Sequence, residues 1–532
     1  MPFMKKTFVA LAILLSINSL FSQEISVTQQ RKLMQTITAI SNLYVDTIND
    51  KKIVEASIKG MLKDLDPHST YTPADEVQRM HEPLEGSFEG IGVQFQILED
   101  TINVVQTISG CPAEKVGVLP GDKIIYIDNE LVAGVKFQNS DVFKRLRGKR
   151  GTEVTIKVKR NSEKELLEFK IVRDKIPIYS VDASYMADKN IGYIKVNSFG
   201  STTTDEFKEA FKKLKKQGMK DLILSLQGNG GGYLITAIGL ADEFLDDNKL
   251  IVYTQGLHQP RTDADASSKG DFEKGRLIVL VDEYSASASE IVSGALQDWD
   301  RAVIVGRRTF GKGLVQRELN LADGSALRLT VARYYTPSGR CIQRPYKDGT
   351  EKYYKDVLNR YSNGELMNKD SIHFPDSLKY TTKILNRTVY GGGGIMPDVF
   401  VPIDTTEYSD FHRSLVAKGI VNRVSLQYLN NNREALKAAY PTFEKYNSNF
   451  EVNEEILNNL IKEAEKEKLK VDTTQFEHSK RLIKQQIKAI IAGDIWQTNE
   501  FYRVIDAENE SLQKALEILK TPNAYENILK KE

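Results

Sequence analysis

The sequence predicts a multidomain α+β protein in which an α/β core follows an inserted β-rich module, with helical regions at both ends. Three observations support this prediction. The chain has 532 residues, several times the length of one domain. Short apolar strands alternate with amphipathic helices from residue 175 to about 405, which is typical of an α/β core. Residues 27–65 and those beyond 406 have apolar side chains at helical spacing, and short β-runs lie between about residue 86 and residue 174. The expected units are 1–22, a targeting segment; 23–85, helical; 86–174, β-rich; 175–405, the core; and 406–532, helical.

The first 22 residues have the pattern of a secretory signal. Lys5 and Lys6 precede an apolar run from Phe8 to Leu15, and the small residue Ser22 stands before Gln23. A short membrane anchor is the alternative, but the run falls well short of the ~20 apolar residues that a spanning helix needs. We therefore expect cleavage near Gln23, export to the periplasm, and no membrane span in the mature chain.

Residues 27–65 carry apolar side chains at helical spacing, which predicts a small helical N-terminal unit. The segment from Leu65 to Pro73 closes this unit, because Pro67 and Pro73 prevent a helix from continuing.

From about Gly86 the pattern changes to short β-runs separated by turn residues. Five strands and a short helix, Asp141 to Arg147, predict a compact mixed module. The expected strands are Val93–Ile97, Ile102–Gln106, Lys123–Ile127, Val154–Val158 and Leu166–Val172.

The core begins with a strand at Ile191–Val196, a helix at Asp205–Gln217 and a strand at Leu222–Leu226. Beyond residue 406 the chain is charged and helical by spacing, and we assign no chemistry to that region. Its expected apolar faces contain Ile456, Leu460, Ile461, Ile483, Ile487, Ile490 and Ile491.

Composition excludes several classes of function. Lys and Arg total 73 against 72 for Asp and Glu, so the net charge of +1 gives no electrostatic basis for binding nucleic acid or an anionic membrane. The two cysteines and six histidines show no metal-binding spacing, so no metal and no cofactor are expected. Cys111 in a turn and Cys341 at a strand edge are expected to be free thiols.

A serine-rich segment, residues 282–291, follows the apolar strand Leu277–Val281 and opens a helix that runs through Gln297. A serine at such a turn exposes its hydroxyl while the following amides face whatever lies above it, which suits an oxyanion. Ser287 and Glu290 also match a capping box, and on this segment alone capping is the simpler interpretation.

Lys312 stands between two glycines in a second segment, residues 308–316, after the strand Ala302–Gly306. Burial would lower the pKa of this lysine until its neutral amine could accept a proton from serine. Gln316 lies an even number of residues further on and would share its face in a strand. A solvated lysine or a phosphate-binding loop is the alternative, but Gly313 stands where a Walker loop needs Ser or Thr. A competing pair, Ser511 and Lys514, lies on a charged helix and is interpreted as surface.

A glycine cluster, Gly228 to Gly232, follows the core strand at Leu222–Leu226. It lacks the spacing of a dinucleotide-binding loop. Consecutive glycines here let main-chain N–H groups approach a developing negative charge.

Together these segments resemble the carboxyl-terminal processing peptidases, also called tail-specific proteases. The similarity covers roughly residues 30–402. It is carried by the serine segment at 285–291, the Phe-Gly-Lys-Gly-x-x-Gln segment whose lysine follows Ser287 by 25 residues, the glycine cluster, Leu65-Asp-Pro-His-Ser69, Tyr334-Tyr-Thr-Pro-Ser-Gly-Arg340 and Gly394-Ile-Met-Pro-Asp398.

The resemblance implies roles for several residues and a core of the crotonase/Clp-like type. Ser287 would be the nucleophile, Lys312 the general base and Gln316 the residue that orients it. The amides of Ala288 and of either Gly231 or Gly232 would form the oxyanion hole. Ser225 and Gln227 depart from the Asp-Leu-Arg-x-Asn that the family usually carries, which we expect to alter local support rather than to abolish activity.

The resemblance also identifies the β-rich module as a PDZ domain. Gly90, Ile91, Gly92 and Val93 would form its carboxylate-binding loop, with the next strand pairing to a peptide C-terminus. The alternative is that the two glycines simply form a turn.

The leading hypothesis is an exported Ser/Lys endopeptidase that captures proteins or peptides with free C-termini and cleaves them through an acyl-enzyme. A regulatory or adaptor protein is a compatible further partner. The alternative is a catalytically silent PDZ adaptor on a protease-like scaffold, which the presence of Ser287, Lys312 and Gln316 opposes. A cytosolic hydrolase is opposed by the signal segment.

Overall fold

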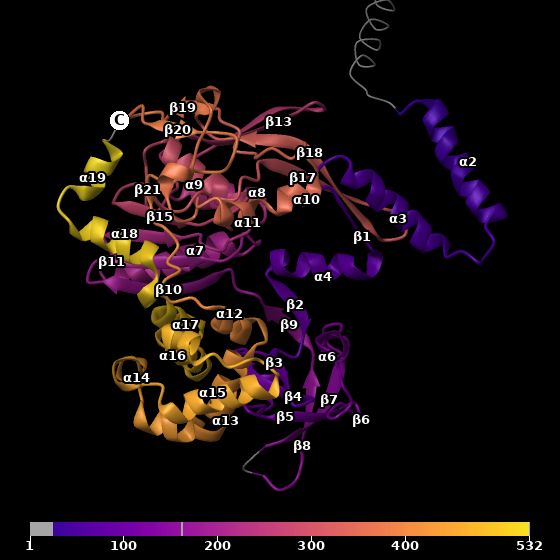
Figure 1. Cartoon of the computed structure of the whole chain (residues 1–532), viewed down its shortest axis with the longest axis vertical. Coiled ribbons are helices and arrows are strands. Elements are labelled where there is room, and N and C mark those ends of the chain that lie inside the picture. The colour runs from indigo at the N-terminus through magenta and orange to yellow at the C-terminus, as the bar shows by residue number, and fades with distance from the viewer. Residues whose placement is uncertain (1–24, 161–162, 531–532) are drawn as a thin grey trace, which may run out of the picture.

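The structure is a computed structural model that describes residues 25–160 and 163–530 of the chain. Figure 1 shows a central body of sheets and helices, a β-rich module beside it, and helical regions at both ends of the chain. The predicted fold class, a multidomain α+β protein with an α/β core, is therefore confirmed. The predicted signal segment, residues 1–22, lies outside the described residues.

The core is a six-stranded sheet in the order β10-β11-β12-β15-β16-β21. All neighbouring strands except β10 and β11 run parallel. Strands β12, β15 and β16 are buried along their whole length, as expected of parallel strands that are covered on both faces. The strands are β10 (Val181–Asp188), β11 (Ile191–Val196), β12 (Asp221–Ser225), β15 (Leu277–Val281), β16 (Val303–Gly306) and β21 (Val399–Phe400).

Helices cover both faces of this sheet. Alternate residues of β12 point to opposite sides: Leu222 and Leu224 join one apolar cluster, and Ile223 joins another. The first cluster is closed by α7 (Thr203–Lys216), α8 (Leu234–Asp242) and α9 (Ala288–Asp298). The second is closed by α18 (Glu510–Lys520) and α19 (Ala524–Leu529), so the C-terminal region completes the core.

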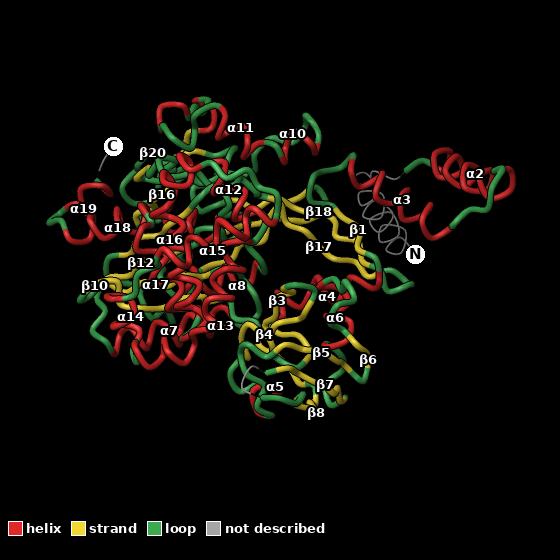
Figure 2. Tube along the Cα trace, turned by 60° about the horizontal axis from the view of Figure 1, so that its bottom comes forward, coloured by secondary structure: helices red, strands yellow, loops and turns green. Residues whose placement is uncertain are grey.

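A second sheet lies beside the first and has five strands in the order β1-β18-β13-β14, with β17 also paired to β18. Figure 2 shows the β17–β18 hairpin reaching toward the N-terminal helices. Residues 70–72, expected within a separate helical unit, instead add a strand to this sheet. The strands are β1 (Thr70–Thr72), β13 (Leu250–Gly256), β14 (Gln259–Asp265), β17 (Leu314–Asn320) and β18 (Ala326–Tyr335).

The β-rich module is a sheet in the order β3-β4-β5-β7-β8, with β6 paired to β5. A ribbon of β2 (Ser87–Gly90) and β9 (Asp174–Pro177) joins it to the core and straddles the boundary expected at residues 174/175. The other elements are β3 (Val93–Leu98), β4 (Thr101–Thr107), α5 (Pro112–Lys115), β5 (Lys123–Ile127), β6 (Glu130–Leu131), α6 (Asn139–Leu146), β7 (Glu153–Lys159) and β8 (Leu167–Val172).

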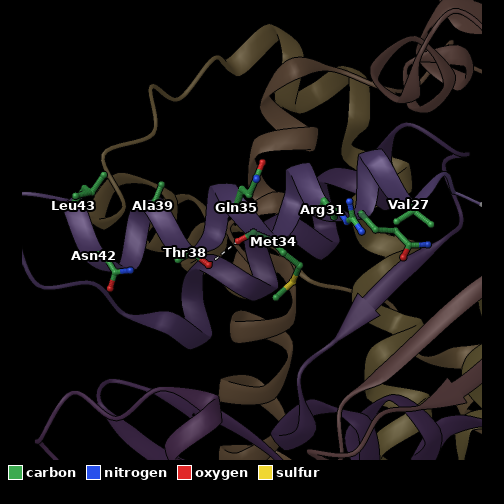
Figure 3. A pocket seen from close by; sticks show the side chains of 9 residues that line it. Val27, Arg31, Met34, Gln35, Thr38, Ala39, Asn42 and Leu43 are labelled. Carbon is green, nitrogen blue, oxygen red and sulfur yellow. Dashed lines mark hydrogen bonds between the residues drawn. The ribbon is translucent and has the colours of Figure 1, made fainter.

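The N-terminal region contains α2 (Val27–Leu43), α3 (Asp50–Lys63) and α4 (Ala74–Glu85). Helix α3 ends before Pro67 and α4 begins after Pro73, as the two prolines predict. No residue of α2 is buried, and the helix stands away from the sheets (Figure 1). Figure 3 shows a shallow hollow that is lined by α2 side chains alone, so it is separate from the chemistry considered below.

The C-terminal helices build a second apolar core of their own, and Ile456, Leu460, Ile483, Ile487 and Ile491 are buried in it as predicted. Within the described part of the chain no helix is both long and apolar enough to cross a membrane. The helices are α12 (Asp410–Ala417), α13 (Ile420–Ala439), α14 (Phe443–Asn449), α15 (Glu454–Lys466), α16 (Thr473–Ile495), α17 (Thr498–Ile505) and the 3-10 turn η3 (Asp506–Glu508).

Both cysteines are free thiols, as expected, but Cys341 lies in a loop and not at a strand edge. Strand β18 ends at Tyr335 because the following residues, with Pro337 and a left-handed Gly339, form a turn. That loop leads to the short elements α10 (Thr350–Tyr354), α11 (Asp356–Ser362), η1 (Lys369–Ser371), η2 (Asp376–Leu378), β19 (Lys379–Thr381) and β20 (Thr388–Tyr390).

Candidate active site

Ser287 occupies the turn between β15 and α9, with a backbone φ of 57°. This left-handed conformation is strained for a residue with a β-carbon, and such strain is typical of functional turns. Ser287 is also the N-cap of α9, and its N–H donates to Glu290 Oε2 at 2.8 Å. The capping interpretation therefore describes this backbone correctly, and it does not exclude a chemical role for the hydroxyl.

The two neighbouring serines have structural roles. The Ser285 hydroxyl donates to the Leu226 carbonyl at 2.7 Å, and the Ser289 hydroxyl donates to the Asn229 carbonyl at 2.9 Å. Both side chains are fully buried, whereas Ser287 is partly exposed. The Ser285 hydroxyl thus ties the serine segment to Leu226 and the Ser289 hydroxyl ties it to the glycine cluster, and of the three serines Ser287 is the one with a partly exposed side chain.

Glu290 connects the serine and lysine segments. Its Oε2 accepts from both the Ser287 N–H and the Lys312 N–H, at 2.8 and 2.9 Å. Its Oε1 accepts from the Gly311 N–H at 2.7 Å and the Thr309 hydroxyl at 2.5 Å. Burial raises the pKa of Glu290, and these four donors oppose that shift. One carboxyl group therefore holds the backbone of Ser287 beside that of Lys312.

Tyr334 makes a second link between the same segments. Its buried hydroxyl lies 3.0 Å from the Ser287 carbonyl oxygen and also contacts the Lys312 carbonyl oxygen. Tyr334 belongs to β18, so the second sheet contributes directly to the spacing of the two segments.

Lys312 lies in a half-buried loop directly before β17. Burial is the main reason that the pKa of its amine is lowered, and Arg328 acts in the same direction. The negative charges of Glu290 and Asp66 oppose the shift. The expected strand periodicity does not relate Lys312 to Gln316, because β17 begins only at Leu314. Gln316 lies opposite Thr330 in the β17–β18 hairpin.

The glycine cluster packs directly against Ser287. A β-carbon placed on Gly231 would lie 2.8 Å from the Ser287 β-carbon and 3.0 Å from the Ala288 nitrogen, so only glycine fits there. The Gly231 N–H donates to Asn229 Oδ1 at 2.8 Å and is already engaged. Gly232 forms a parallel bridge with Phe199, whose bonds go to the flanking residues Gly231 and Tyr233. The Gly232 N–H therefore points away from Phe199.

The segments at residues 334–340 and 394–398, which also carry the family resemblance, support helix α9. Arg340 and Asp298 form a fully buried ion pair, 2.7 Å apart, at the C-terminal end of α9. Asp398 accepts from the Gln297 side chain at 2.9 Å and from the Ile304 N–H at 2.7 Å, which joins α9 to β16. These contacts hold the helix that carries Ser287 at its start.

Gly90, Ile91, Gly92 and Val93 lie in the β-rich module and are not part of the Ser287 cluster. Gly90 ends β2 and is paired with Asp174, whereas Gly92 is left-handed, with φ 81°. Val93 begins β3, which is an edge strand of its sheet. Phe95 of β3 and Phe143 of α6 meet with ring centroids 5.4 Å apart beside this edge.

The sequence predicts only a capping role for Glu290 and no role for Tyr334 or Asp66. Each lies in one of the motifs described above, but further partners of each come from distant parts of the chain. Among the described residues, no group of three or more His, Cys, Asp or Glu side chains is arranged to hold a metal ion.

Profiles of four known families match the chain. They are peptidase family S41 at residues 190–352, a PDZ domain at 90–171, the activating protease CtpB N-terminal domain at 14–76, and a family of unknown function at 411–497.

Individual proteins are similar over longer stretches. The carboxy-terminal-processing protease of Bartonella bacilliformis is 39% identical over 305 residues, which cover 56% of this chain and 69% of the relative. The carboxy-terminal processing protease CtpA of Bacillus subtilis is 35% identical over 343 residues, 64% of this chain and 72% of the relative. A solved photosystem II D1 C-terminal processing protease is 28% identical, with a TM-score of 0.34, over 60% of this chain and 91% of that one.

Proposed function

The chain belongs to the carboxy-terminal processing proteases, serine peptidases of family S41 with a PDZ domain, and we propose that it is an exported endopeptidase with a Ser287/Lys312 dyad. The observation that carries the proposal is the Glu290 carboxyl group, whose Oε2 accepts from the backbone of both Ser287 and Lys312. The main chains of two residues 25 positions apart in sequence are thereby joined through one carboxyl group, and Gly231 of the glycine cluster lies against Ser287.

The proposed reaction begins when the neutral Lys312 amine takes the proton of the Ser287 hydroxyl as Oγ attacks the scissile carbonyl carbon. The lowered pKa of Lys312 supports this role, because it increases the fraction of neutral amine. The resulting ammonium returns the proton to the leaving amine as the C–N bond breaks, which leaves an acyl-enzyme. A water molecule then gives one proton to Lys312 as its oxygen bonds to the acyl carbon. The bond between the acyl carbon and Oγ breaks, Lys312 returns the proton to Ser287 Oγ, and the product leaves as a carboxylic acid.

The oxyanion would be held by two backbone amides. Ala288 is the first residue of α9, and a helix leaves its first amides without intrahelical partners. For the second donor we favour Gly232 over Gly231, because the Gly231 N–H already donates to Asn229. Removing one such donor from a comparable site costs roughly 10²–10³ in kcat.

The PDZ domain would capture the substrate C-terminus. The amides of Ile91, Gly92 and Val93, next to Gly90 at the end of β2, can meet a terminal carboxylate. The free edge of β3 can then pair with the peptide as an added strand. Proteins or peptides with free C-termini are thus the proposed substrates. We further propose the periplasm as the location.

The test is proteolysis of an unfolded protein by Ser287→Ala, Ser285→Ala and Ser289→Ala. Ser287→Ala is expected to abolish cleavage. The other two changes each remove a buried hydroxyl that satisfies a carbonyl, so they are expected to lower stability by about 1–3 kcal/mol while folded enzyme keeps substantial activity. If Ser287→Ala cleaves the protein at the wild-type rate, Ser287 is not the nucleophile. The cleavage would then come from a contaminating protease, and the alternative of a catalytically silent PDZ adaptor would be favoured.

A further inference from the structure

Asp66, from the N-terminal segment Leu65–Pro73, reaches the β17–β18 hairpin near the proposed dyad. Its buried carboxylate accepts from four donors. Three are local: the N–H groups of His68 and Ser69, at 2.8 and 3.0 Å, and the Ser69 hydroxyl, at 2.6 Å. The fourth is the Thr330 hydroxyl of β18, at 3.0 Å. The Thr330 N–H in turn donates to the Ser69 hydroxyl oxygen at 3.1 Å.

Thr330 also contacts Gln316, the residue directly opposite it on β17, with 3.3 Å between Gln316 Nε2 and Thr330 Oγ1. The direction of this bond follows from Asp66. A carboxylate can only accept hydrogen bonds, and a hydroxyl group has one proton to donate. Because Thr330 donates that proton to Asp66, its hydroxyl oxygen can only accept a hydrogen bond from Gln316. The NH₂ end of the Gln316 amide must therefore face Thr330, which leaves Gln316 Oε1 directed elsewhere.

We propose that Asp66 and Thr330 are positioning residues, which orient the Gln316 amide so that its oxygen is free to accept a hydrogen bond from the Lys312 amine when substrate is bound. A neutral amine that donates one N–H to a fixed acceptor has its lone pair directed, and the lone pair must face the Ser287 hydroxyl for proton transfer. The inference rests on the proposed function, because it deepens the role of Lys312 as base and Gln316 as the orienting residue.

Asp66 is also close enough to act on Lys312 by its charge. Its negative charge raises the pKa of the Lys312 amine, as does Glu290, while Arg328 lowers it. His68, two residues after Asp66 in the same segment, shares a hydrogen bond with the Tyr353 hydroxyl, with 2.9 Å between His68 Nε2 and the hydroxyl oxygen. The pKa of His68 is lowered to about 4, first by burial and then by the charges of Lys312 and Arg344, with Asp66 opposing. His68 is thus neutral at working pH and adds no charge beside the dyad.

The experiment compares Thr330→Val, which removes the hydroxyl, with Thr330→Ser, which keeps it. Thr70→Val is the matched control, because Thr70 lies on β1 in the same sheet with an exposed side chain. Cleavage of an unfolded protein gives kcat and KM, and the labelling rate of Ser287 by a fluorophosphonate detects slow variants. Thr330→Val should lower kcat and labelling at least tenfold with little change in KM, while Thr330→Ser and Thr70→Val stay within about threefold of wild type.

A double-mutant cycle separates positioning from general support. If Thr330 acts through Gln316, adding Thr330→Val to Gln316→Ala should cause no further loss, whereas a purely structural role predicts additive losses. Asp66→Asn offers an independent measurement. It should lower kcat, because the neutral asparagine oxygen, which still faces the N–H groups of His68 and Ser69, is a weaker acceptor for the Thr330 hydroxyl than the carboxylate and holds Thr330 less firmly. It should also shift the acid limb of the kcat profile to lower pH, because the charge that favours the Lys312 ammonium is gone.

Wild-type kcat in Thr330→Val, additivity with Gln316→Ala, or wild-type kcat in Asp66→Asn would each overturn the inference. If Thr330→Val does not fold, judged by its thermal transition, the kcat of Asp66→Asn decides. Failure of the proposed function is distinguishable, since it would appear as activity in Ser287→Ala or Lys312→Ala.

Discussion

Ser287 and Lys312, the two residues of the proposed dyad, are held through their main-chain atoms by the side chains of two other residues. The Glu290 carboxyl group and the Tyr334 hydroxyl both bind main-chain atoms of Ser287 and Lys312. Such links fix the two segments whatever the protonation state of the lysine. The Lys312 side chain can then exchange a proton without moving these two segments, as the proposed role of general base requires.

Lys312→Arg should inactivate the enzyme, because a guanidinium group does not release its proton near neutral pH. In the wild-type enzyme the pKa of Lys312 is lowered, so the neutral amine should persist below the usual range for lysine. Activity should then be lost as falling pH protonates it. A pH profile of kcat between pH 5 and 10 tests both statements. An active Lys312→Arg enzyme, or a rate that rises as the solution becomes acidic, would contradict this assignment.

At the scale of single helices, α16 of the C-terminal region carries a largely buried aspartate, Asp494, at its C-terminal end. Asp494 lies in its last turn, where the helix dipole disfavours an anion, next to the buried residues Ile491 and Ala492. Burial raises the pKa of Asp494 to about 7, although Arg433 of α13 opposes the shift. This carboxyl group therefore binds its proton more tightly in the folded protein than in the unfolded chain.

The sign of the effect on stability follows from that difference. With a folded pKa near 7 and an unfolded value of 3.8, the contribution of Asp494 is fully present below pH 3.8 and is lost as the pH rises through 7. Asp494→Asn should therefore stabilise the protein at pH 8 by about 1–2 kcal/mol, a value reduced for the partial exposure of this side chain. Little gain is expected at pH 4.

Thermal unfolding of the full chain at pH 4, 6 and 8 would measure this. Asp247→Asn, which changes an exposed aspartate, is the control. An equal effect of Asp494→Asn at all three pH values would show that the carboxyl group does not titrate as described.

At the scale of the whole molecule, the C-terminal region is part of the catalytic core. Helices α18 and α19 cover one face of the six-stranded sheet, at the left of the central body in Figure 1. Asn509 donates to the Gln227 side chain at 2.8 Å, and Lys195 donates to the Gln227 carbonyl at 3.0 Å. Gln227, one of the two departures from the family pattern, is thus supported by the C-terminal region directly before the glycine cluster.

Tyr525 of α19 gives a test of this arrangement. Its buried hydroxyl accepts from the Leu277 N–H at 3.3 Å and lies 3.1 Å from the Leu277 carbonyl oxygen, at the start of β15. Tyr525→Phe should cost about 1–3 kcal/mol of stability with little change in kcat, because it leaves buried polar groups unpaired far from Ser287. Urea unfolding beside Tyr179→Phe, at an exposed tyrosine, would measure it. Equal midpoints for the two variants would contradict the proposed support.

The proposed carboxylate-binding loop and the proposed Ser287/Lys312 dyad lie in different modules, and this arrangement predicts how substrates are selected. If Ile91, Gly92 and Val93 hold a terminal carboxylate, amidation of the substrate C-terminus removes the charge that those amides meet. A peptide pair that differs only in this group should be cleaved at different rates, mainly through KM, and the acid should be faster. Deletion of residues 86–174 should erase the difference. If the peptide with a free C-terminal carboxylate and its amidated counterpart are cleaved at equal rates, the protease assignment stands but the proposed recognition of a free C-terminus is wrong.

The fold class, the strands Lys123–Ile127, Ile191–Val196 and Leu277–Val281, and the family are all predictable from the amino-acid pattern and its motifs. Period-two and helical patterns arise from local geometry, so they can be detected within a few residues of sequence.

How these strands, helices and loops pack against one another became known from the three-dimensional structure. That residues 70–72 join β18, that Asp66 reaches Thr330, and that α4 forms despite Pro83 could not be predicted. These features depend on contacts between residues hundreds of positions apart, such as the Asp66–Thr330 bond. Their stability comes from burial and hydrogen bonding in the assembled core, which no local pattern records.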